Sequence, residues 1–450
     1  MSKLFPGGIK NYIMQSDFLK SISVLFSGNL IANAISFASI PIISRIYNQE
    51  AFGEYTVIIS LSSILVAIVS FGLTSAIMAP KEDNESKELL TIVTKGEIIT
   101  VSALCIVVAF FPPIIRYFNI SLNALYTCFL FAAYTIAQGV FGLLSVYTNK
   151  LKLNRVLFWN ALINALAMFV FAIPLGLLGL KSDGLLIAAI LSYTVADMQM
   201  IMNTRPFVKN VNKSRILELI KKYKNFILFQ YPSNLINTFA QQYPNQFFSK
   251  KFGKSNLGSY AMCERILGVP MRLLGVPINT VYFRQASIYT KEGRDLSQFT
   301  FKLVTVLLGI SFIPIIILYL FSEPIFTFIL GAGWSEVGQI VSILIIPYFL
   351  SFCCNCISYC MVVIDKQHIN LTLDVIKLFI IGSALLIGFK YSDSFLQMLN
   401  YYAWALTLFH LLHLMTVFFC LKKHFVRFVI VVLIYLAAIF MIKFLIMGIL

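Results

Sequence analysis

The stretch SGNLIANAISFASIPIISRIYNQEAFGEY, residues 27–55, decides the fold, because the chain repeats its pattern 205 residues later. Residues 232–260 read PSNLINTFAQQYPNQFFSKKFGKSNLGSY and align with it without a gap. Six positions are identical: Asn29, Leu30, Ile31, Ser44, Gly53 and Tyr55 match Asn234, Leu235, Ile236, Ser249, Gly258 and Tyr260. Internal repeats of this length are typical of membrane transporters.

The composition around this repeat is that of a membrane protein. The chain has 450 residues, of which 59% are hydrophobic and only 12% are charged, and its mean hydropathy is +0.85. A helix needs about 20 apolar residues to cross a bilayer, and such runs follow one another along the whole sequence. Too little polar chain remains to form a soluble domain, so a soluble enzyme is excluded.

The apolar runs predict an all-α polytopic membrane protein with twelve core transmembrane helices. A further run at 425–449 predicts an extra C-terminal transmembrane helix. The twelve predicted spans lie near residues 19–44, 55–79, 92–111, 122–147, 156–180, 184–203, 225–249, 257–283, 302–321, 337–364, 370–389 and 395–420.

The repeat also predicts how the helices are organised. It pairs the first span with the seventh, so both copies run in the same direction through the membrane. We therefore expect two parallel, pseudo-symmetric six-helix bundles, at 1–203 and 225–420, joined by a basic linker at 204–224 and followed by an additional helix at 421–450. Most Lys and Arg fall on one side when the amino terminus is placed in the cytoplasm, which is the positive-inside pattern.

The basic linker has two interpretations. It can act as a topology determinant facing anionic lipid, or it can dock a partner. Its seven basic residues are Arg205, Lys209, Lys213, Arg215, Lys221, Lys222 and Lys224.

Amides are spaced along one face of two predicted spans. In the seventh span Asn234, Asn237, Gln241 and Asn245 follow one another at intervals of three and four residues, which places them on one helical face. Asn29 and Asn33 form a shorter stripe in the first span. Amides facing lipid are costly. These side chains are therefore expected either to hydrogen-bond between helices or to line a solute cavity.

Charged side chains inside predicted spans are the strongest candidates for ligand-binding or ion-binding residues. Arg265 and Arg272 share a face of the eighth span and suit the binding of an anion such as phosphate. They could instead form a structural pair with Glu264 or with a partner helix. Asp374 and Lys377 can reach one another at i and i+3, as a salt bridge or as part of a site. Asp197 could take up a coupling ion or be solvated near the membrane interface.

Several function classes lack their motifs. The sequence has no phosphate-binding loop, no paired-histidine zinc motif and no nucleophile elbow. The eight cysteines lie in apolar runs, where thiols usually pack as small hydrophobic groups. We therefore expect no catalytic residues, no cofactor and no metal, and no nucleic-acid partner.

Two segments resemble a known family. FQYPSNLINTFAQQYPNQFFSK, residues 229–250, and LGSYAMCERILGVPMRLLGVPI, residues 257–278, are similar to the second half of the Wzx-type polysaccharide and O-antigen flippases. GNLIANAISFASIPIISRIYNQEAFGEY, residues 28–55, is similar to the opening of that family. These flippases belong to the multidrug, oligosaccharidyl-lipid and polysaccharide exporter superfamily. A thirteenth span would depart from its usual twelve.

The resemblance implies a transporter and not an enzyme. Its members are multi-pass proteins of the bacterial inner membrane that act in lipopolysaccharide and polysaccharide biosynthesis. They move an undecaprenyl-pyrophosphate-linked oligosaccharide, such as an O-antigen repeat unit, from the cytoplasmic to the periplasmic leaflet. Membrane lipids are implied partners, and so are other assembly proteins such as a polymerase and a chain-length regulator. The role of receiving the pyrophosphate would fall on Arg265 and Arg272.

From the residues themselves, Lys377 and the amides of the two stripes are further candidates for substrate binding. Asp197, Glu264 and Asp374 are candidates for ion coupling. Two alternatives stay open: a drug or cation antiporter of the same superfamily, and an integral-membrane glycan polymerase. A cation cavity should be lined by carboxylates, and a polymerase tends to carry extended outward loops.

Overall fold

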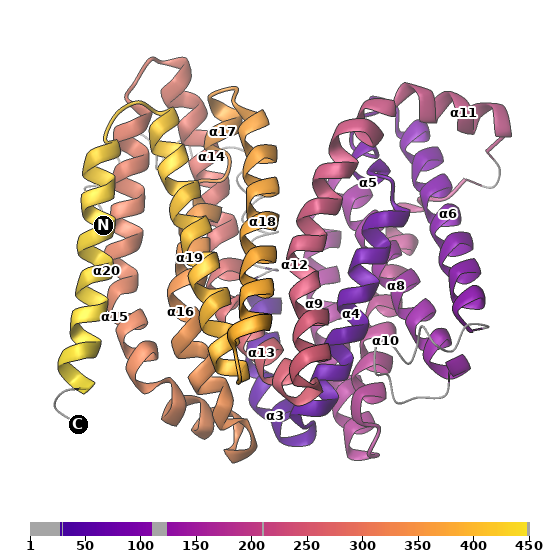
Figure 1. Ribbon diagram of the computed structural model, residues 1–450. Helices are drawn as coiled ribbons and strands as arrows, with labels where there is room; N and C mark the ends of the chain where they lie inside the picture. The colour runs from indigo at the N-terminus through magenta and orange to yellow at the C-terminus, as the bar shows by residue number, and fades with distance from the viewer. Residues whose placement is uncertain (1–27, 29, 110–123, 209–210, 448–450) are drawn as a thin grey trace. The chain divides into compact units, whose positions relative to one another are not determined.

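The computed structural model describes residues 28, 30–109, 124–208 and 211–447 (Figure 1). Within these ranges every regular element is a helix. Ten of the described helical segments are long and apolar enough to cross a membrane. The chain is therefore an all-α, multi-pass membrane protein, as the apolar runs predict.

The chain divides into two compact units, each of which is described by itself. The first comprises Met1–Tyr47 and Glu54–Gln242, and the second comprises Asn48–Gly53 and Tyr243–Leu450. Helix α12 (Tyr231–Phe252) gives its first part to one unit and its remainder to the other.

The other elements follow in chain order. The first set is α3 (Ile40–Ile46), α4 (Gln49–Val69), α5 (Leu73–Ala76), α6 (Asp83–Ala109), α8 (Ala124–Lys150), α9 (Asn154–Leu177), α10 (Lys181–Thr204), α11 (Lys213–Lys222) and the π-helical turn η1 (Phe226–Gln230). After α12 come α13 (Lys254–Leu267), the π-helical turn η2 (Met271–Gly275), α14 (Val276–Lys291), α15 (Leu296–Leu330), η3 (Ala332–Trp334), α16 (Ser335–Cys356), α17 (Cys360–Val363), α18 (Gln367–Tyr391), α19 (Phe395–Cys420) and α20 (Phe425–Met447).

Several predicted spans differ from the helices in extent. Helix α6 begins at Asp83, nine residues before the predicted span. Helix α15 continues to Leu330 through a kink at Phe321, where the sequence predicted a connecting loop. Helix α12 is not among the ten apolar segments, since its amides lower its hydropathy. The predicted first span lies partly outside the described residues.

The first unit has a core where α5, α6, α8, α10 and α11 meet. Leu90, Leu144, Tyr147 and Met200 are all fully buried in it. Leu219 of α11 is buried in the same cluster. The basic segment after α10 is thus an amphipathic helix that packs onto the bundle through its apolar side.

Aromatic side chains organise the second unit. The fully buried ring of Phe248 makes edge-to-face contacts with Tyr260, Phe395 and Tyr402, at centroid distances of 5.1, 5.5 and 5.5 Å. These contacts join α12, α13 and α19, and edge-to-face packing adds to the stabilisation from burial.

The C-terminal apolar run also forms a helix of the second unit. Helix α20 packs against α15 and α19, beside which it lies in Figure 1. Its Phe428 stacks on Phe418 of α19 with a centroid distance of 4.3 Å. The extra helix expected from the sequence is therefore present as a packed element.

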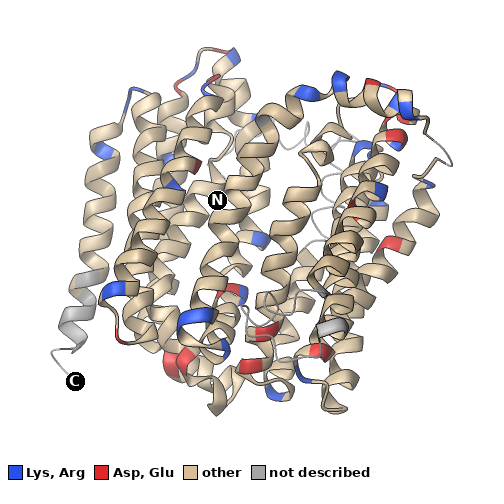
Figure 2. Ribbon diagram, turned by 45° about the vertical axis from the view of Figure 1, so that its right-hand side comes forward, with Lys and Arg blue, Asp and Glu red and all other residues tan. Residues whose placement is uncertain are grey.

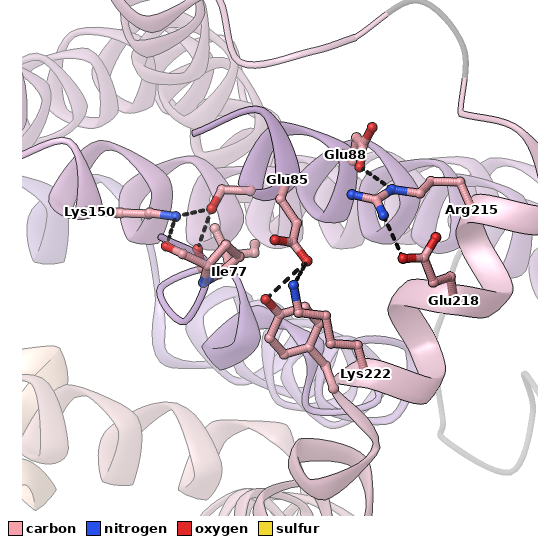
Figure 3. A network of polar contacts seen from close by, with 10 residues as sticks. Ile77, Glu85, Glu88, Lys150, Arg215, Glu218 and Lys222 are labelled. Atoms are coloured by element: carbon pink, nitrogen blue, oxygen red, sulfur yellow. Dashed lines mark hydrogen bonds and ion pairs between the residues drawn. The ribbon is translucent and has the colours of Figure 1, made fainter. Parts of the chain in front are cut away.

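Charged residues lie mainly at helix ends and in the connections between helices (Figure 2). One group fixes α11 to the start of α6 (Figure 3). Arg215 Nε lies 2.9 Å from Glu88 Oε2, and its Nη1 lies 2.8 Å from Glu218 Oε1. Lys222 Nζ donates to Glu85 Oε1 at 2.6 Å. These hydrogen bonds to carboxylates raise the pKa of Arg215 and of Lys222.

Candidate functional site

The two candidate arginines lie on one nearly continuous helical segment of the second unit. Arg265 is in the last turn of α13, and Arg272 is in the π-helical turn η2. The Nη2 of Arg272 donates to the backbone carbonyl of Arg265 at 2.8 Å. Pro270 and Pro277 flank the turn and lack the N–H that a regular α-helix would use, which favours a widened turn.

Glu264 is held by tyrosines. Its Oε1 accepts hydrogen bonds from Tyr260 Oη at 2.9 Å and from Tyr348 Oη at 2.6 Å. Tyr348 lies on α16, so the carboxyl group ties α13 to a neighbouring helix. The hydrogen bonds described at Glu264 come from hydroxyls and not from a guanidinium group. The described partners of the Glu264 carboxyl group are thus Tyr260 and Tyr348.

Lys377 lies among aromatic side chains of the second unit. Its Nζ lies 5.7 Å from the centroid of the Phe409 ring on α19, within the range of a cation–π interaction. It also interacts electrostatically with Asp374, His410 and His413. In the described part of the chain no ion pair joins Asp374 to Lys377. The described residues thus do not show the salt bridge between Asp374 and Lys377 that their i, i+3 spacing allows.

The amide stripe lies along α12 as its spacing predicts. Asn234 and Gln241 are exposed, Asn237 is half-buried, and Asn245 is buried in the second unit. Gln241 Nε2 donates to Asn237 Oδ1 at 3.0 Å, so neighbouring amides of the stripe hydrogen-bond along the helix.

The first span contributes little to the described site. Asn33 is half-buried in the first unit. Asn29 lies outside the described residues, as does Lys209 of the basic linker.

Asp197 differs from its expected setting. The sequence placed it near the interface, where solvation would explain it, but the side chain is buried within the first unit. Glu97, on α6, is buried in the same unit and interacts with it electrostatically. The sequence analysis did not single out Glu97. The acidic residue within the predicted span at 92–111 was the signal that could have found it.

The candidate residues therefore fall into two groups. Arg265, Arg272, Lys377, Glu264, Asp374 and Asn245 belong to the second unit, whereas Asn33, Asn234, Asn237, Gln241 and Asp197 belong to the first. Guanidinium groups and an ammonium group beside tyrosine hydroxyls can bind an anion and hydrogen-bond a polar ligand. Buried carboxyl groups can bind a cation.

Comparisons with solved structures show which fold this is. The chain is similar to the lipid II flippase MurJ in an inward closed conformation, with a TM-score of 0.69 and 14% identity, covering 94% of this chain and 100% of that one. It is also similar to a multidrug resistance MATE family transporter of the MOP superfamily in an inward-facing conformation. That TM-score is 0.63 at 14% identity, covering 90% of this chain and 99% of the other.

Sequence comparisons show the family. The succinoglycan biosynthesis transport protein ExoT of Rhizobium meliloti (strain 1021) is 22% identical over 315 residues, which is 69% of this chain. The match spans 62% of the length of that relative, less than two thirds. A family model described as polysaccharide biosynthesis protein matches residues 24–339. The chain has the fold of the exporter superfamily that its sequence resembles, and it belongs to the polysaccharide biosynthesis protein family.

Proposed function

We propose that this protein is a flippase that moves an undecaprenyl-pyrophosphate-linked oligosaccharide from the cytoplasmic to the periplasmic leaflet of a bacterial inner membrane. The observation that carries the proposal is the pair Arg265 and Arg272 on one helical segment of a chain that belongs to the polysaccharide biosynthesis protein family. Guanidinium groups match phosphate oxygens in geometry and keep their charge.

In the proposed mechanism the two arginines receive the pyrophosphate, with Lys377 as an additional cation of the second unit. The amides of α12 hydrogen-bond to sugar hydroxyls, and the polyprenyl chain stays in lipid. The protein then alternates between access to one leaflet and access to the other, as repeat-built transporters do.

The membrane potential favours the proposed direction. With a negative cytoplasm, each negative charge that moves outward gains about 2.3 kcal/mol per 100 mV if no counter-ion travels with it. A pyrophosphate diester carrying about two charges could be driven by the potential alone. Coupling to an ion would add to this force.

In the same proposal the amino terminus lies in the cytoplasm. The network formed by α11 and the start of α6 then faces the cytoplasm, in agreement with the positive-inside distribution of Lys and Arg.

Deletion of the gene tests the function. We expect lipid-linked oligosaccharide to accumulate on the cytoplasmic leaflet and to return to the periplasmic side when the native gene is restored. Accumulation on the outer leaflet would instead indicate a polymerase. Unchanged surface glycan with new sensitivity to cationic drugs would indicate the antiporter, which the similarity to a multidrug transporter keeps as the second candidate.

A further inference from the structure

Two buried carboxyl groups lie inside the first unit, and no positive side chain of the described residues acts on them. Glu97 of α6 is 3% exposed and Asp197 of α10 is 7% exposed. Glu97 Oε1 and Asp197 Oδ1 are buried and have no hydrogen-bond partner among the described residues. Buried polar atoms are nearly always hydrogen-bonded, so two unpartnered carboxyl oxygens in one bundle require an explanation.

The two carboxyl groups come from different helices, α6 and α10, and interact electrostatically with one another. The backbone N–H of Val208, four residues after the end of α10, donates to Thr91 Oγ1 of α6 at 3.2 Å and so joins the following segment to α6. Glu97 is six residues further along α6 than Thr91, and Asp197 is seven residues before the end of α10 at Thr204. At 1.5 Å per residue, Glu97 is about 9 Å along α6 from Thr91, and Asp197 is about 10 Å along α10 from Thr204.

Helix α8 leaves room for the Glu97 side chain between its neighbours. It packs against both α6 and α10. A Cβ atom at Gly139 of α8 would overlap the Glu97 carboxyl group. The carboxyl group therefore occupies space that is open only because residue 139 is a glycine. Thr94, one turn earlier on α6, has a buried hydroxyl that also lacks a partner among the described residues.

The groups around the pair are neutral. Tyr193 is the titratable neighbour of Asp197 on α10, and it interacts with Tyr134 of α8. Helix α9 contributes Asn160, whose Nδ2 donates to the Ala196 carbonyl at 2.7 Å. In the described part of the chain no lysine, arginine or histidine acts electrostatically on either carboxyl group.

We infer that Glu97 and Asp197 form a proton-binding site of the first unit, at which at least one of the two carboxyl groups is protonated in this conformation. Ionised carboxylates that are buried without a counter-charge are strongly disfavoured, and protonation removes the charge. A proton from water adds to a carboxylate oxygen and is later released to water. No group of three or more metal-ligating acidic, histidine or cysteine side chains occurs among the described residues, which favours a proton over a metal ion.

Under the proposed function, release and uptake of this proton would couple export of the glycan to the proton gradient. The coupling rests on the proposed flippase activity, but proton binding does not. The site can therefore be tested on purified protein without any substrate.

Infrared spectroscopy of the full-length protein in lipid vesicles tests the site. We expect the carbonyl stretch of a protonated, buried carboxyl group at neutral pH. This band should be lost or shifted in both Glu97→Gln and Asp197→Asn, and should persist in Glu82→Gln, which alters an exposed acid outside the bundle. A band that is absent from the native protein, or is unchanged in both variants, would overturn the inference. Loss of the band on replacing potassium by sodium would assign the site to a metal ion instead.

Substitutions at two glycines of α8 provide a matched pair of variants in which Glu97 and Asp197 are both unchanged. Gly139→Ala should displace the Glu97 carboxyl group and shift the band, whereas Gly142→Ala should not, because nothing lies within 4 Å of a Cβ there. Equal spectra for the two variants would contradict the assignment to Glu97. If the band behaves as expected but export does not occur, the proposed function fails and the proton site stands.

Discussion

Gly53 and Gly258 occupy equivalent positions of the internal repeat and make reciprocal backbone contacts. A Cβ atom at Gly53 would overlap the carbonyl of Lys254, and one at Gly258 would overlap the carbonyl of Gln49. Gln49 and Lys254 are related by the same offset of 205 residues. The first turns of α4 and α13 therefore cross with local twofold symmetry, within the unit that includes Asn48–Gly53.

This symmetry predicts that Gly53→Ala and Gly258→Ala lower the stability of the protein by similar amounts. Each adds a methyl group where the backbones touch, so each should destabilise the protein by about 1–3 kcal/mol. Thermal unfolding of the purified protein in detergent measures this. Because both glycines serve one crossing, the double variant should cost less than the sum of the two. Gly142→Ala is the control, and destabilisation by Gly142→Ala equal to that by the other two would contradict the interpretation.

Much of this fold could be predicted because its signals are local or periodic. Apolar runs of about 20 residues locate helices, and the repeat from residue 27 pairs the first with the seventh. The extent of α15 could not be predicted, since the helix passes through Phe321 and Pro324 with only a kink. The docking of α11 depends on Leu219 fitting a core that includes residues far away in the sequence, such as Tyr147.

The ion pairs between α11 and α6 are expected to hold α11 against the bundle. Arg215→Glu places a carboxylate beside Glu88 and Glu218 and should release α11, since like charges repel. Backbone hydrogen exchange of residues 213–222 should then accelerate, and it should also accelerate in native protein at high salt, which screens exposed pairs. Adding Glu88→Arg should restore part of the protection. Exchange in Arg215→Glu that matches the native protein would show that the Arg215 ion pairs do not hold the helix in place.

The ionised carboxyl group of Asp295 is expected to stabilise the fold, and this contribution should be lost at acid pH. Its Oδ1 accepts from the backbone N–H of Gln298 at 3.1 Å, and its Oδ2 lies 3.1 Å from Lys423 Nζ. These interactions lower the pKa of Asp295 below its ordinary value of 3.8, the backbone hydrogen bond contributing most. A carboxyl group with a lowered pKa stabilises the fold above the unfolded value, and this contribution is lost as pH falls through the folded one.

Asp295→Asn should therefore flatten the acid limb of a plot of melting temperature against pH. Asparagine keeps the helix cap but removes the charge. The change should be below about 1 kcal/mol, because the pair with Lys423 is largely exposed. Asp393→Asn, at another exposed acid, is the control. An identical acid limb in native protein and Asp295→Asn would refute the assignment.

The hydrogen bond from Tyr348 of α16 to Glu264 is expected to contribute to the stability of the fold. Tyr348→Phe removes the donor at 2.6 Å and should lower stability by about 1 kcal/mol, the size measured for hydrogen bonds between membrane helices. Tyr359→Phe changes an exposed tyrosine and should have no such effect. Equal melting temperatures for the native protein and Tyr348→Phe would mean that the bond is not stabilising.

The candidate site could be predicted only in part. Arg265 and Arg272 share a face because they are seven residues apart on one helical segment, which the sequence shows. The setting of Lys377 depends on Phe409 of another helix, so spacing within its own helix suggested a salt bridge instead. Glu97 was overlooked although it lies within the predicted span at 92–111; because α6 begins at Asp83, its side chain lies further from the helix end than the prediction placed it.

Transport by variants of the two arginines tests the central claim most directly. The protein is reconstituted in vesicles with undecaprenyl-pyrophosphate-linked oligosaccharide, and the amount of glycan reaching the opposite leaflet is measured for native protein, Arg265→Ala, Arg272→Ala and the control Arg427→Ala, which alters an exposed arginine of α20. We predict at least about a tenfold loss of rate for each of the first two, equivalent to about 1.4 kcal/mol in transition-state free energy, with Arg427→Ala unchanged. Native rates for correctly folded Arg265→Ala and Arg272→Ala would contradict the proposal that these guanidinium groups receive the pyrophosphate.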